Sequence, residues 1–448
     1  MNATSPTIPA IEPYPRPVQA WATVFILLLL YVVSMLDRNI ITLLGEQIRV
    51  DLDLSDVQLS LLYGPAFAVS FAAGALPLGW AMDRFSRRKV LWAGVTVWSF
   101  GTMLCGLSHT FTQIFGARAL VGAGEAALVP GNQSILADTF PPDRLGFPIS
   151  IYSLGSKFGQ GGSLIIGGFL TALIAPSALI ALPLLGDLYG WQVILVVVGA
   201  PGLLLALLVF AIPEPVRRNR ASPGADPVGY PKFFAFMKEN ARFFTGIIGG
   251  GTMASVAVSA IMAWTPTYFI RLHDMSFGEA GYWLGLAIMI GPVIGLPLHG
   301  LIADRLFRRG IRDAHLRYLV FACLLGMPLL AGAFVTSNTV LALIVFSIGY
   351  TLFHAFAVLG VVSLQLRVPG DMRGKAASIS LVTTSIIGLS LGPVVTAWIS
   401  EGLFNDPMMI GYALGACAAI FLPLTALFYS LAMKPIRTHL EAQERALA

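Results

Sequence analysis

The sequence reads GWAMDRFSRR at residues 79–88 and GLIADRLFRR at residues 300–309. Both stretches follow a long apolar run, and both fit the pattern G-x-x-x-D-R-x-x-R-R. The two copies start 221 positions apart, which is close to half of the 448 residues. This repeat predicts a chain built from two related halves.

The composition indicates a protein whose solvent is lipid. Hydrophobic residues make up 56% of the chain and charged residues only 11%, whereas a soluble domain carries roughly 25% charged residues. No cleavage site of small residues follows the first apolar run, so we expect a retained span and not a signal peptide. The three cysteines lie in apolar runs without ligand spacing, so we expect no disulfide framework, metal or cofactor.

Apolar runs of about 20 residues, the length that crosses a bilayer, predict twelve transmembrane helices. In the first half we place them at residues 21–44, 57–82, 90–107, 111–137, 146–174 and 191–212. In the second half we place them at residues 243–270, 280–303, 316–335, 340–366, 376–400 and 408–433. The expected fold is therefore an all-α polytopic membrane protein with two pseudo-symmetric six-helix bundles.

The same map divides the chain into five segments. They are an N-terminal segment 1–20, a first bundle 21–212, a linker 213–242, a second bundle 243–433 and a tail 434–448. The linker is rich in proline and arginine, which is typical of a connection outside the membrane. Residues 176–189 are expected to be an irregular surface or re-entrant segment on the side opposite the linker.

The distribution of charge predicts the orientation of the chain. The side with both termini carries 23 of the 28 Lys and Arg residues and 12 of the 23 acidic ones, against two and nine on the opposite side. Because cytoplasmic loops collect Lys and Arg, we expect both termini in the cytoplasm and a multi-pass protein of the cell membrane. Topology thus explains the net charge of +5, and no nucleic-acid partner is expected.

The repeated pattern lies where a helix meets the cytoplasm. Its acid can accept hydrogen bonds from basic side chains or from the N-terminus of a neighbouring helix, and its glycine allows close helix approach. We expect a conformational latch between the bundles; the alternative is a plain basic boundary of the membrane span. The expected latch residues are Gly79, Asp83, Arg84, Arg87, Arg88, Gly300, Asp304, Arg305, Arg308 and Arg309.

Charged residues inside the spans are functional-site candidates because burying a charge in a bilayer is costly. There are five, all in the first half: Asp37, Arg38, Arg118, Glu125 and Lys157. At about 1.5 Å per residue, Asp37 and Arg118 come out at similar depth and are expected to pair, while Glu125 lies lower and open to the cytoplasmic side. Asp37 or Glu125 is a candidate proton carrier; the alternative is a static ion pair between the first and fourth helices.

The second half has no Lys, Arg, Asp or Glu deep in its spans. Its candidate lining residues are Trp264, Tyr268, Met289, Phe353, His354 and Phe356. One charged wall and one apolar wall would suit an amphipathic substrate whose anionic head binds Arg38 or Lys157. The alternatives are ordinary helix packing for the aromatic residues and a hydrogen-bonded core position for His354.

The double motif, together with Pro213-Glu214-Pro215 at the end of the sixth helix, resembles the major facilitator superfamily over essentially the whole chain. This resemblance implies alternating access around a site near the midplane between two bundles. The sequence departs from the family in the fifth helix, where residues 155–162 read GSKFGQGG without the expected proline. That departure disfavours a drug/proton antiporter.

Three stretches of the first half resemble spinster-type transporters: LDRN at 36–39, RALVGAGEA at 118–126 and LADTFPPDR at 136–144. The resemblance implies movement of lysolipids or sphingoid phosphates, with proton coupling in some members. It marks Asp37, Arg38, Arg118 and Glu125 as site residues. Organic-anion symporters share part of the fourth-helix pattern, so a carrier of a small organic anion or drug-like molecule is the alternative.

An enzyme and a channel are the competing classes. His299 and Asp304 fit H-x4-D, a spacing that some membrane acyltransferases use for a general base and its orienting acid. The first repeat has Leu78 in place of His299, and the repeat already explains Asp304, so we expect no enzyme. Nothing resembles a selectivity filter. We expect a secondary active transporter, working as a monomer, for a small molecule or lipid together with protons.

Overall fold

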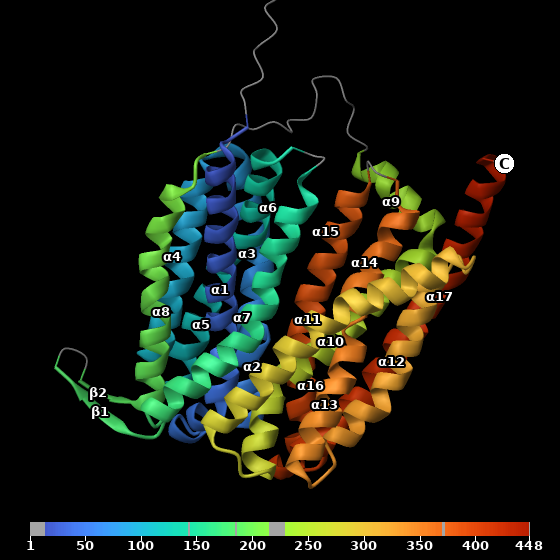
Figure 1. Ribbon diagram of the computed structural model, residues 1–448. Helices are drawn as coiled ribbons and strands as arrows, with labels where there is room; N and C mark the ends of the chain where they lie inside the picture. Colours follow the sequence, from blue (N-terminus) through green and yellow to red (C-terminus); the bar gives the residue numbers. More distant parts are fainter. Residues whose placement is uncertain (1–13, 142–143, 184–185, 215–228, 370–371, 448) are drawn as a thin grey trace, which may run out of the picture.

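The computed structural model describes residues 14–141, 144–183, 186–214, 229–369 and 372–447. These residues are almost entirely helical, and the helices form two bundles that stand side by side (Figure 1). Both described ends of the chain lie at one end of the bundles, which we call the terminal end. The opposite end carries a small β-hairpin and is called the hairpin end. The expected all-α polytopic fold of two bundles is confirmed.

The first bundle consists of six helical columns. Its elements are α1 (Pro17–Asp51), α2 (Asp56–Tyr63), α3 (Pro65–Arg84), α4 (Arg87–Gly106), α5 (Phe111–Glu125), α6 (Leu128–Thr139), α7 (Gly146–Leu173), α8 (Gly190–Leu208) and a short 3-10 turn, η2 (Val209–Ala211). Helices α2 and α3 form one column, broken at Gly64, where Pro65 starts the second helix. Helices α5 and α6 form another, broken after Glu125.

The second bundle repeats this arrangement. Its elements are α10 (Ala241–Leu272), α11 (Phe277–Arg308), α12 (Ala314–Ala333), α13 (Thr339–Phe353), α14 (Phe356–Arg367), α15 (Arg373–Thr383), η3 (Thr384–Leu389), α16 (Ser390–Ala397), η4 (Trp398–Leu403), η5 (Pro407–Met409) and α17 (Ile410–Leu447). Helices α13 and α14 form one column. The segments from α15 to η4 form another, in which η3 and η4 are π-helical turns.

The internal repeat is most regular in one pair of columns. Helices α5 and α13 both have 15 residues, and α6 and α14 both have 12. Each of the later helices begins 228 positions after its counterpart. Glu125 therefore corresponds to Phe353, and Arg118 corresponds to Phe346. The two halves share a backbone here but not its chemistry.

By length and hydropathy, nine segments of the described chain are apolar enough to cross a membrane. All six columns of the second bundle are among them. The three columns that fall short, α4, α5–α6 and α7, belong to the first bundle. Two of them carry the intramembrane charges Arg118, Glu125 and Lys157. The polar residues of the spans are thus concentrated in one half.

Three segments differ from the sequence prediction. Residues 176–189, expected to be irregular, contain the antiparallel hairpin of β1 (Leu179–Leu182) and β2 (Gly186–Tyr189). The linker contains α9 (Tyr230–Glu239), whose Phe233 and Phe236 pack on Phe244. The expected tail continues α17, which remains helical to its last described residues. Short amphipathic elements beside proline-rich or polar sequence have too few residues to reveal their period.

The two halves meet toward the hairpin end. Helices α7 and α11 cross at glycines, and a Cβ on Gly281 would lie 2.4 Å from the carbonyl oxygen of Leu164. Arg271 on α10 binds Glu46 at 2.7 Å and Asp56 at 2.7 Å across the interface. The bundles lean together at this end and stand apart at the terminal end (Figure 1). Ion pairs and glycine contacts thus hold the hairpin end closed.

Candidate functional site

An ion pair joins α1 to the end of α5 inside the first bundle. Arg38 binds Oε2 of Glu125 through Nη2 and also through Nε, at 3.1 Å. Ser34, one turn earlier on α1, donates to the same oxygen at 2.9 Å. The other carboxylate oxygen, Oε1, is buried without a hydrogen-bond partner among the described residues. One oxygen therefore holds the ion pair, and the other keeps its lone pairs unused.

The two members of the ion pair differ in exposure. The side chain of Arg38 is 26% exposed, whereas that of Glu125 is completely buried. The guanidinium of Arg38 lies over the ring of Phe67, 4.2 Å from its centroid, and 5.7 Å from that of Phe71. A guanidinium is weakly hydrated and stacks well on aromatic faces. Arg38 thus stands between a buried acid and accessible space, in a position to exchange one anionic partner for another.

Arg118 lies deeper and binds main-chain oxygens. It is buried and donates to the carbonyl oxygens of Asp37, at 3.3 Å, and Arg38, at 2.6 Å. The expected side-chain pair of Asp37 and Arg118 is absent, and neither carboxyl oxygen of Asp37 has a described hydrogen-bond partner. Asp37 instead lies beside Trp98 and Thr102 of α4. Successive residues of a helix point about 100° apart, so similar depth did not imply a shared direction.

The position of Glu125 also differs from the one expected from the sequence. Depth along the helix suggested a carboxylate open to the terminal end, but its side chain is enclosed by α1. Helix α5 stops at Glu125, and the chain turns before α6 begins at Leu128. The break lets the carboxylate of Glu125 face Ser34 and Arg38, which donate its described hydrogen bonds.

Lys157 on α7 is the fifth intramembrane charge. Its ammonium group has one described hydrogen bond, to Oε1 of Gln160 at 3.4 Å. It lies near His354, which is at the break between α13 and α14 in the other half. His354 is buried beside Tyr350, with ring centroids 4.4 Å apart, and its Nδ1 has no described hydrogen-bond partner. These two residues bring basic groups of both halves into electrostatic range.

The aromatic candidates of the second half are packed side chains. Trp264 donates to the carbonyl oxygen of Pro393 at 3.0 Å and meets the ring of Tyr63 from the first half at 5.5 Å. Tyr268 donates to the carbonyl oxygen of Ala333 at 3.0 Å and lies 2.8 Å from Nε2 of His273. Phe353 and Phe356 pack on each other, 5.4 Å apart. Met289 packs against Gly161 of α7.

The first copy of the repeated motif ties helix ends of its own half together. Arg87 binds Asp138 at the end of α6, at 2.6 Å, and Arg88 binds Glu214 at 3.2 Å. Arg84 stacks over Trp80, with 4.7 Å to the ring centroid. A Cβ on Gly79 would have no neighbour within 4 Å, so close helix approach does not require this glycine here. The side chain of Asp83, central to the expected latch, lies outside the described residues.

Glu214 accepts hydrogen bonds from three consecutive residues of this first copy, Ser86, Arg87 and Arg88. Besides Arg88, its carboxylate accepts hydrogen bonds from the hydroxyl of Ser86 at 2.5 Å and from the main-chain nitrogen of Arg87 at 2.9 Å. Partial burial acts to raise the pKa of Glu214, but these hydrogen bonds outweigh it and hold the pKa below its usual value. An anion at the start of α4 is also favoured by the helix dipole.

The second copy is arranged differently. Asp304 faces His315 at 3.1 Å, and a Cβ on Gly300 would meet no atom within 4 Å. Its arginines, Arg305, Arg308 and Arg309, are exposed, and none has an ion-pair partner in the described part of the chain. The two copies thus share a sequence pattern but not a set of contacts.

His299 and Asp304 do not form the pair that an acyltransferase would need. Nδ1 of His299 lies 2.9 Å from the hydroxyl of Tyr318, and Nε2 lies 2.9 Å from the carbonyl oxygen of Thr351. Asp304 is bound to His315 instead. His299 is therefore a hydrogen-bonded core residue.

Sequence reasoning missed several partners of the site residues. Ser34 and Phe67 carry no charge, and nothing in the sequence distinguishes them from ordinary span residues. Glu214 was visible between two prolines, but its contact with Arg88 joins residues more than 120 positions apart. The spacing of Ser34 and Arg38, four apart on one helix face, was the one available signal for their shared partner.

Comparison with known proteins agrees with this geometry. Residues 27–393 match the family model of the Major Facilitator Superfamily. The chain is 26% identical to an MFS-type efflux pump of Mycolicibacterium smegmatis over 96% of both chains. It is also 26% identical to a probable galactarate/D-glucarate transporter of Bacillus subtilis, over 95% of this chain and 94% of that protein.

A solved structure has the same fold. It is a bacterial homologue of the human lysosomal transporter Spinster, crystallised in an inward-facing, unoccupied conformation. The superposition gives a TM-score of 0.79 and covers 94% of this chain and 98% of that one, with 24% sequence identity. A family match over this length, with the same two-bundle fold, is decisive: this chain belongs to the major facilitator superfamily of membrane transporters.

Proposed function

We propose that this protein is a proton-coupled secondary transporter for an anionic amphipathic lipid, such as a lysophospholipid or a sphingoid phosphate. The observation that carries the proposal is the Arg38–Glu125 ion pair, which joins a partly exposed cation to a buried acid. The excess of Lys and Arg at the terminal end supports a cytoplasmic location of both termini in a cell membrane.

Coupling follows from competition for Arg38. While Glu125 is ionised, it holds the guanidinium together with Ser34. A proton on Glu125 removes that negative charge and frees Arg38 for an anionic head group. Conversely, an anion that takes Arg38 leaves a buried carboxylate unpaired, which favours proton uptake. Proton and anion therefore bind together, and the coupling is symport.

The two halves offer different surfaces to such a substrate. Arg38 and Lys157 supply positive charge from the first half. The spans of the second half contain no Lys, Arg, Asp or Glu deep in the membrane and present mainly apolar and aromatic side chains. An anionic head on one wall and an acyl chain on the other would satisfy both surfaces.

A small organic dianion is the second candidate. The similarity to a probable galactarate/D-glucarate transporter favours it, because Arg38 and Lys157 together could hold a carboxylate without any use of the apolar wall. This candidate predicts that short, chain-free anions compete for transport, whereas the lipid candidate predicts that affinity rises with chain length.

Alternating access requires the two ends to open in turn. The contacts of Arg271 and the glycine crossing of α7 and α11 favour a conformation closed at the hairpin end. Opening that end would break them while the terminal end closes. We propose that the repeated motifs act as the latch in that second conformation, with Asp83 as its acid. The contacts of Arg87 and Arg88 keep the helix ends of the first half rigid.

The test is uptake into proteoliposomes with and without a pH gradient, using labelled lysophosphatidylglycerol, sphingosine phosphate and galactarate. We expect saturable uptake of the lipids that rises with the gradient. Arg38→Gln should lower it at least about tenfold, because a charged hydrogen bond to the head is lost. Arg445→Gln, at an arginine of α17 that is 82% exposed and lies outside both copies of the motif, is the matched control and should leave uptake near wild type.

Uptake of galactarate, without uptake of either lipid, would show that the substrate is an organic dianion and not a lipid. Lipid uptake that does not change with the pH gradient would contradict proton coupling. Uptake by Arg38→Gln at the wild-type level would show that Arg38 does not bind the substrate.

A further inference from the structure

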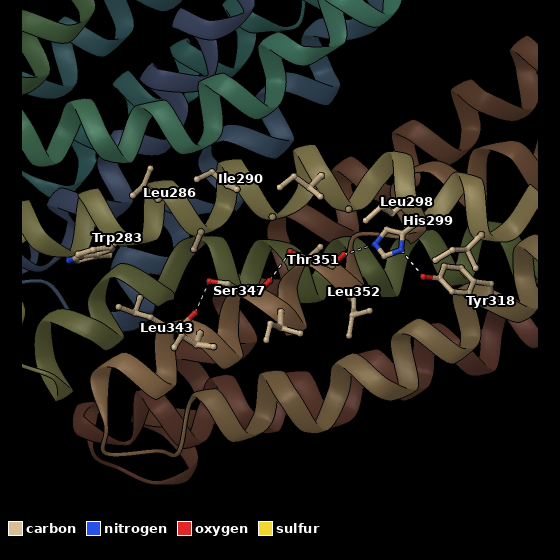
Figure 2. Close-up of a pocket in the computed structure, with 17 residues that line it drawn as sticks. Trp283, Leu286, Ile290, Leu298, His299, Tyr318, Leu343, Ser347, Thr351 and Leu352 are labelled. Atoms are coloured by element: carbon tan, nitrogen blue, oxygen red, sulfur yellow. Dashed lines mark hydrogen bonds between the residues drawn. The ribbon is translucent and has the colours of Figure 1, made fainter.

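A cavity of about 670 Å³ opens on the side of the second bundle, between α11 and α13 (Figure 2). Its rim is formed by side chains that are about half exposed, such as Ile290 (47%), Ile294 (58%) and Ile348 (50%). Exposed apolar side chains at the depth of a membrane span face lipid. The cavity therefore opens toward the bilayer. Its lining residues all belong to the second half, so the cavity is separate from the Arg38–Glu125 site.

The cavity exists because the residues that form its floor are small. Gly291 and Gly295 lie on α11, where both come close to Thr351 of α13. Ser347 lies one turn before Thr351 on α13, and Figure 2 labels both residues. A Cβ on Gly291 would lie 2.2 Å from Oγ1 of Thr351, and one on Gly295 would lie 2.4 Å from its Cγ2. The helices therefore approach each other only because these positions are glycines. Between the small residues of the floor and the branched residues of the rim, a groove remains.

The polar groups of the groove are already satisfied by the protein. The hydroxyl of Ser347 donates to the carbonyl oxygen of Leu343 at 2.6 Å, and that of Thr351 donates to Ser347 at 2.7 Å. His299 uses both ring nitrogens, on Tyr318 and on the carbonyl oxygen of Thr351. The groove offers no charge, and the only lining side chain whose donor has no described partner is Trp283, at the hairpin end of the groove, so a hydrocarbon chain fits the chemistry of the rest. Its volume lies within the range of about 300–1,000 Å³ that is usual for ligand sites.

A pair of arginines continues the groove at the terminal end. Ile302 is the last residue of α11 that lines the cavity. Arg305 and Arg309 follow three and seven positions later, so they lie on the same face of the helix. Both are exposed and lack a described ion-pair partner. The second copy of the repeated motif thus places two available cations beyond the end of an apolar groove.

We infer that this groove binds an anionic phospholipid from the leaflet at the terminal end. One acyl chain lies between α11 and α13, and the phosphate lies at Arg305 and Arg309. If the terminal end is cytoplasmic, as proposed above, this leaflet is the one that collects anionic lipids. The lipid is a bound component of the bilayer at a site separate from the transported substrate.

The test is native mass spectrometry of the purified, delipidated full-length protein, titrated with phosphatidylglycerol and phosphatidylcholine. We expect one saturable, tighter site for phosphatidylglycerol. Because each surface arginine contributes to binding an anionic lipid, Arg305→Gln with Arg309→Gln should weaken phosphatidylglycerol roughly tenfold or more and leave phosphatidylcholine unchanged. Arg84→Gln, in the first copy, is the matched control.

Binding of the acyl chain in the groove is tested separately from binding of the phosphate. Ser347→Phe should fill the floor and weaken both lipids, with a thermal melt to verify that the variant is folded. In the wild-type protein, phosphatidylglycerol with a photoreactive group on its chain should crosslink to residues 286–302 and 343–352. Glu125→Gln, which frees Arg38 for an anion at the transport site, should leave the crosslinks within residues 286–302 and 343–352 unchanged, and this readout separates the groove from the transport site.

Equal binding of phosphatidylglycerol by the wild type and the double arginine variant would overturn the head-group assignment. Crosslinks spread over all outer helices, without enrichment in those two segments, would overturn the groove.

Discussion

The columns α5–α6 and α13–α14 are the same element built twice, with equal helix lengths and a break at the same position. In the first half, that backbone carries Arg118 and Glu125, and in the second half it carries Phe346 and Phe353. The charged column binds α1 through an ion pair and main-chain carbonyls. The aromatic column is filled by ring packing.

Both halves have the same helix break, but the side chains around it differ. A helix break inside a membrane leaves main-chain groups that neighbouring helices must satisfy, so both halves keep it inside the bundle. Only the first half uses it to position an acid. Charges in a bilayer are costly, and that half offsets the cost with Ser34, Phe67 and the carbonyl oxygens of α1. The intramembrane charges Asp37, Arg38, Arg118, Glu125 and Lys157 are thus concentrated in one bundle.

The largest effect should come from breaking the charged column at its buried cation. Arg118→Met removes two hydrogen bonds that a buried guanidinium donates to the carbonyl oxygens of Asp37 and Arg38, and a hydrogen bond from a charged group contributes about 1.5–3 kcal/mol. Phe346→Leu, at the matching position of the second half, should cost only about 1 kcal/mol because the site stays apolar. Thermal or denaturant unfolding in one detergent measures both variants. Equal losses would show that the two columns are energetically alike.

A smaller effect is expected where the two halves are joined. Arg271→Gln removes the cation that binds Glu46 and Asp56 across the interface, and it should shift the population toward an open hairpin end by about 2 kcal/mol, roughly thirtyfold. Spin labels at Val50 and Met408, both exposed, would report a longer distance. Arg49→Gln is the control, because its described partners Glu46 and Asp56 belong to its own half. An unchanged distance distribution for Arg271→Gln would contradict its role as a gate.

The smallest effect concerns the two copies of the repeated motif. The folded pKa of Glu214 is lowered, so its contribution to stability is full above the unfolded pKa and is lost as pH falls through the folded pKa. Because the carboxylate is partly exposed, Glu214→Gln should cost less than about 1 kcal/mol at pH 7. The gap to wild type should vanish in acid. Melting curves from pH 7 down to about pH 2, below the usual range of a glutamate pKa, measure it, and a constant gap would refute the contribution of ionised Glu214.

The sequence predicted the architecture because its signals are long and repeated. Twelve apolar runs and two copies of one motif define the columns and their pairing. The short elements escaped prediction: α9 has ten residues in a proline-rich linker, and each strand of the hairpin has four. A period cannot be read from so few residues.

The site was predicted as a set of residues but not as a set of contacts. Charge inside the spans identified Asp37, Arg38, Arg118 and Glu125, which the structure brings together between α1 and α5. The pairing was different because it depends on the rotation of each helix about its axis, which depth along the helix does not give. The role of Phe67 between two guanidinium groups depends on tertiary packing that no local pattern encodes.

The proposed coupling of the proton to the substrate through Glu125 and Arg38 can be tested by comparing two modes of transport in Glu125→Gln proteoliposomes. The exposed Glu239→Gln is the matched control. We predict that Glu125→Gln, a mimic of the protonated acid, retains exchange of labelled for unlabelled substrate at equilibrium but loses accumulation driven by a pH gradient. Gradient-driven accumulation at the wild-type level in Glu125→Gln would contradict this coupling.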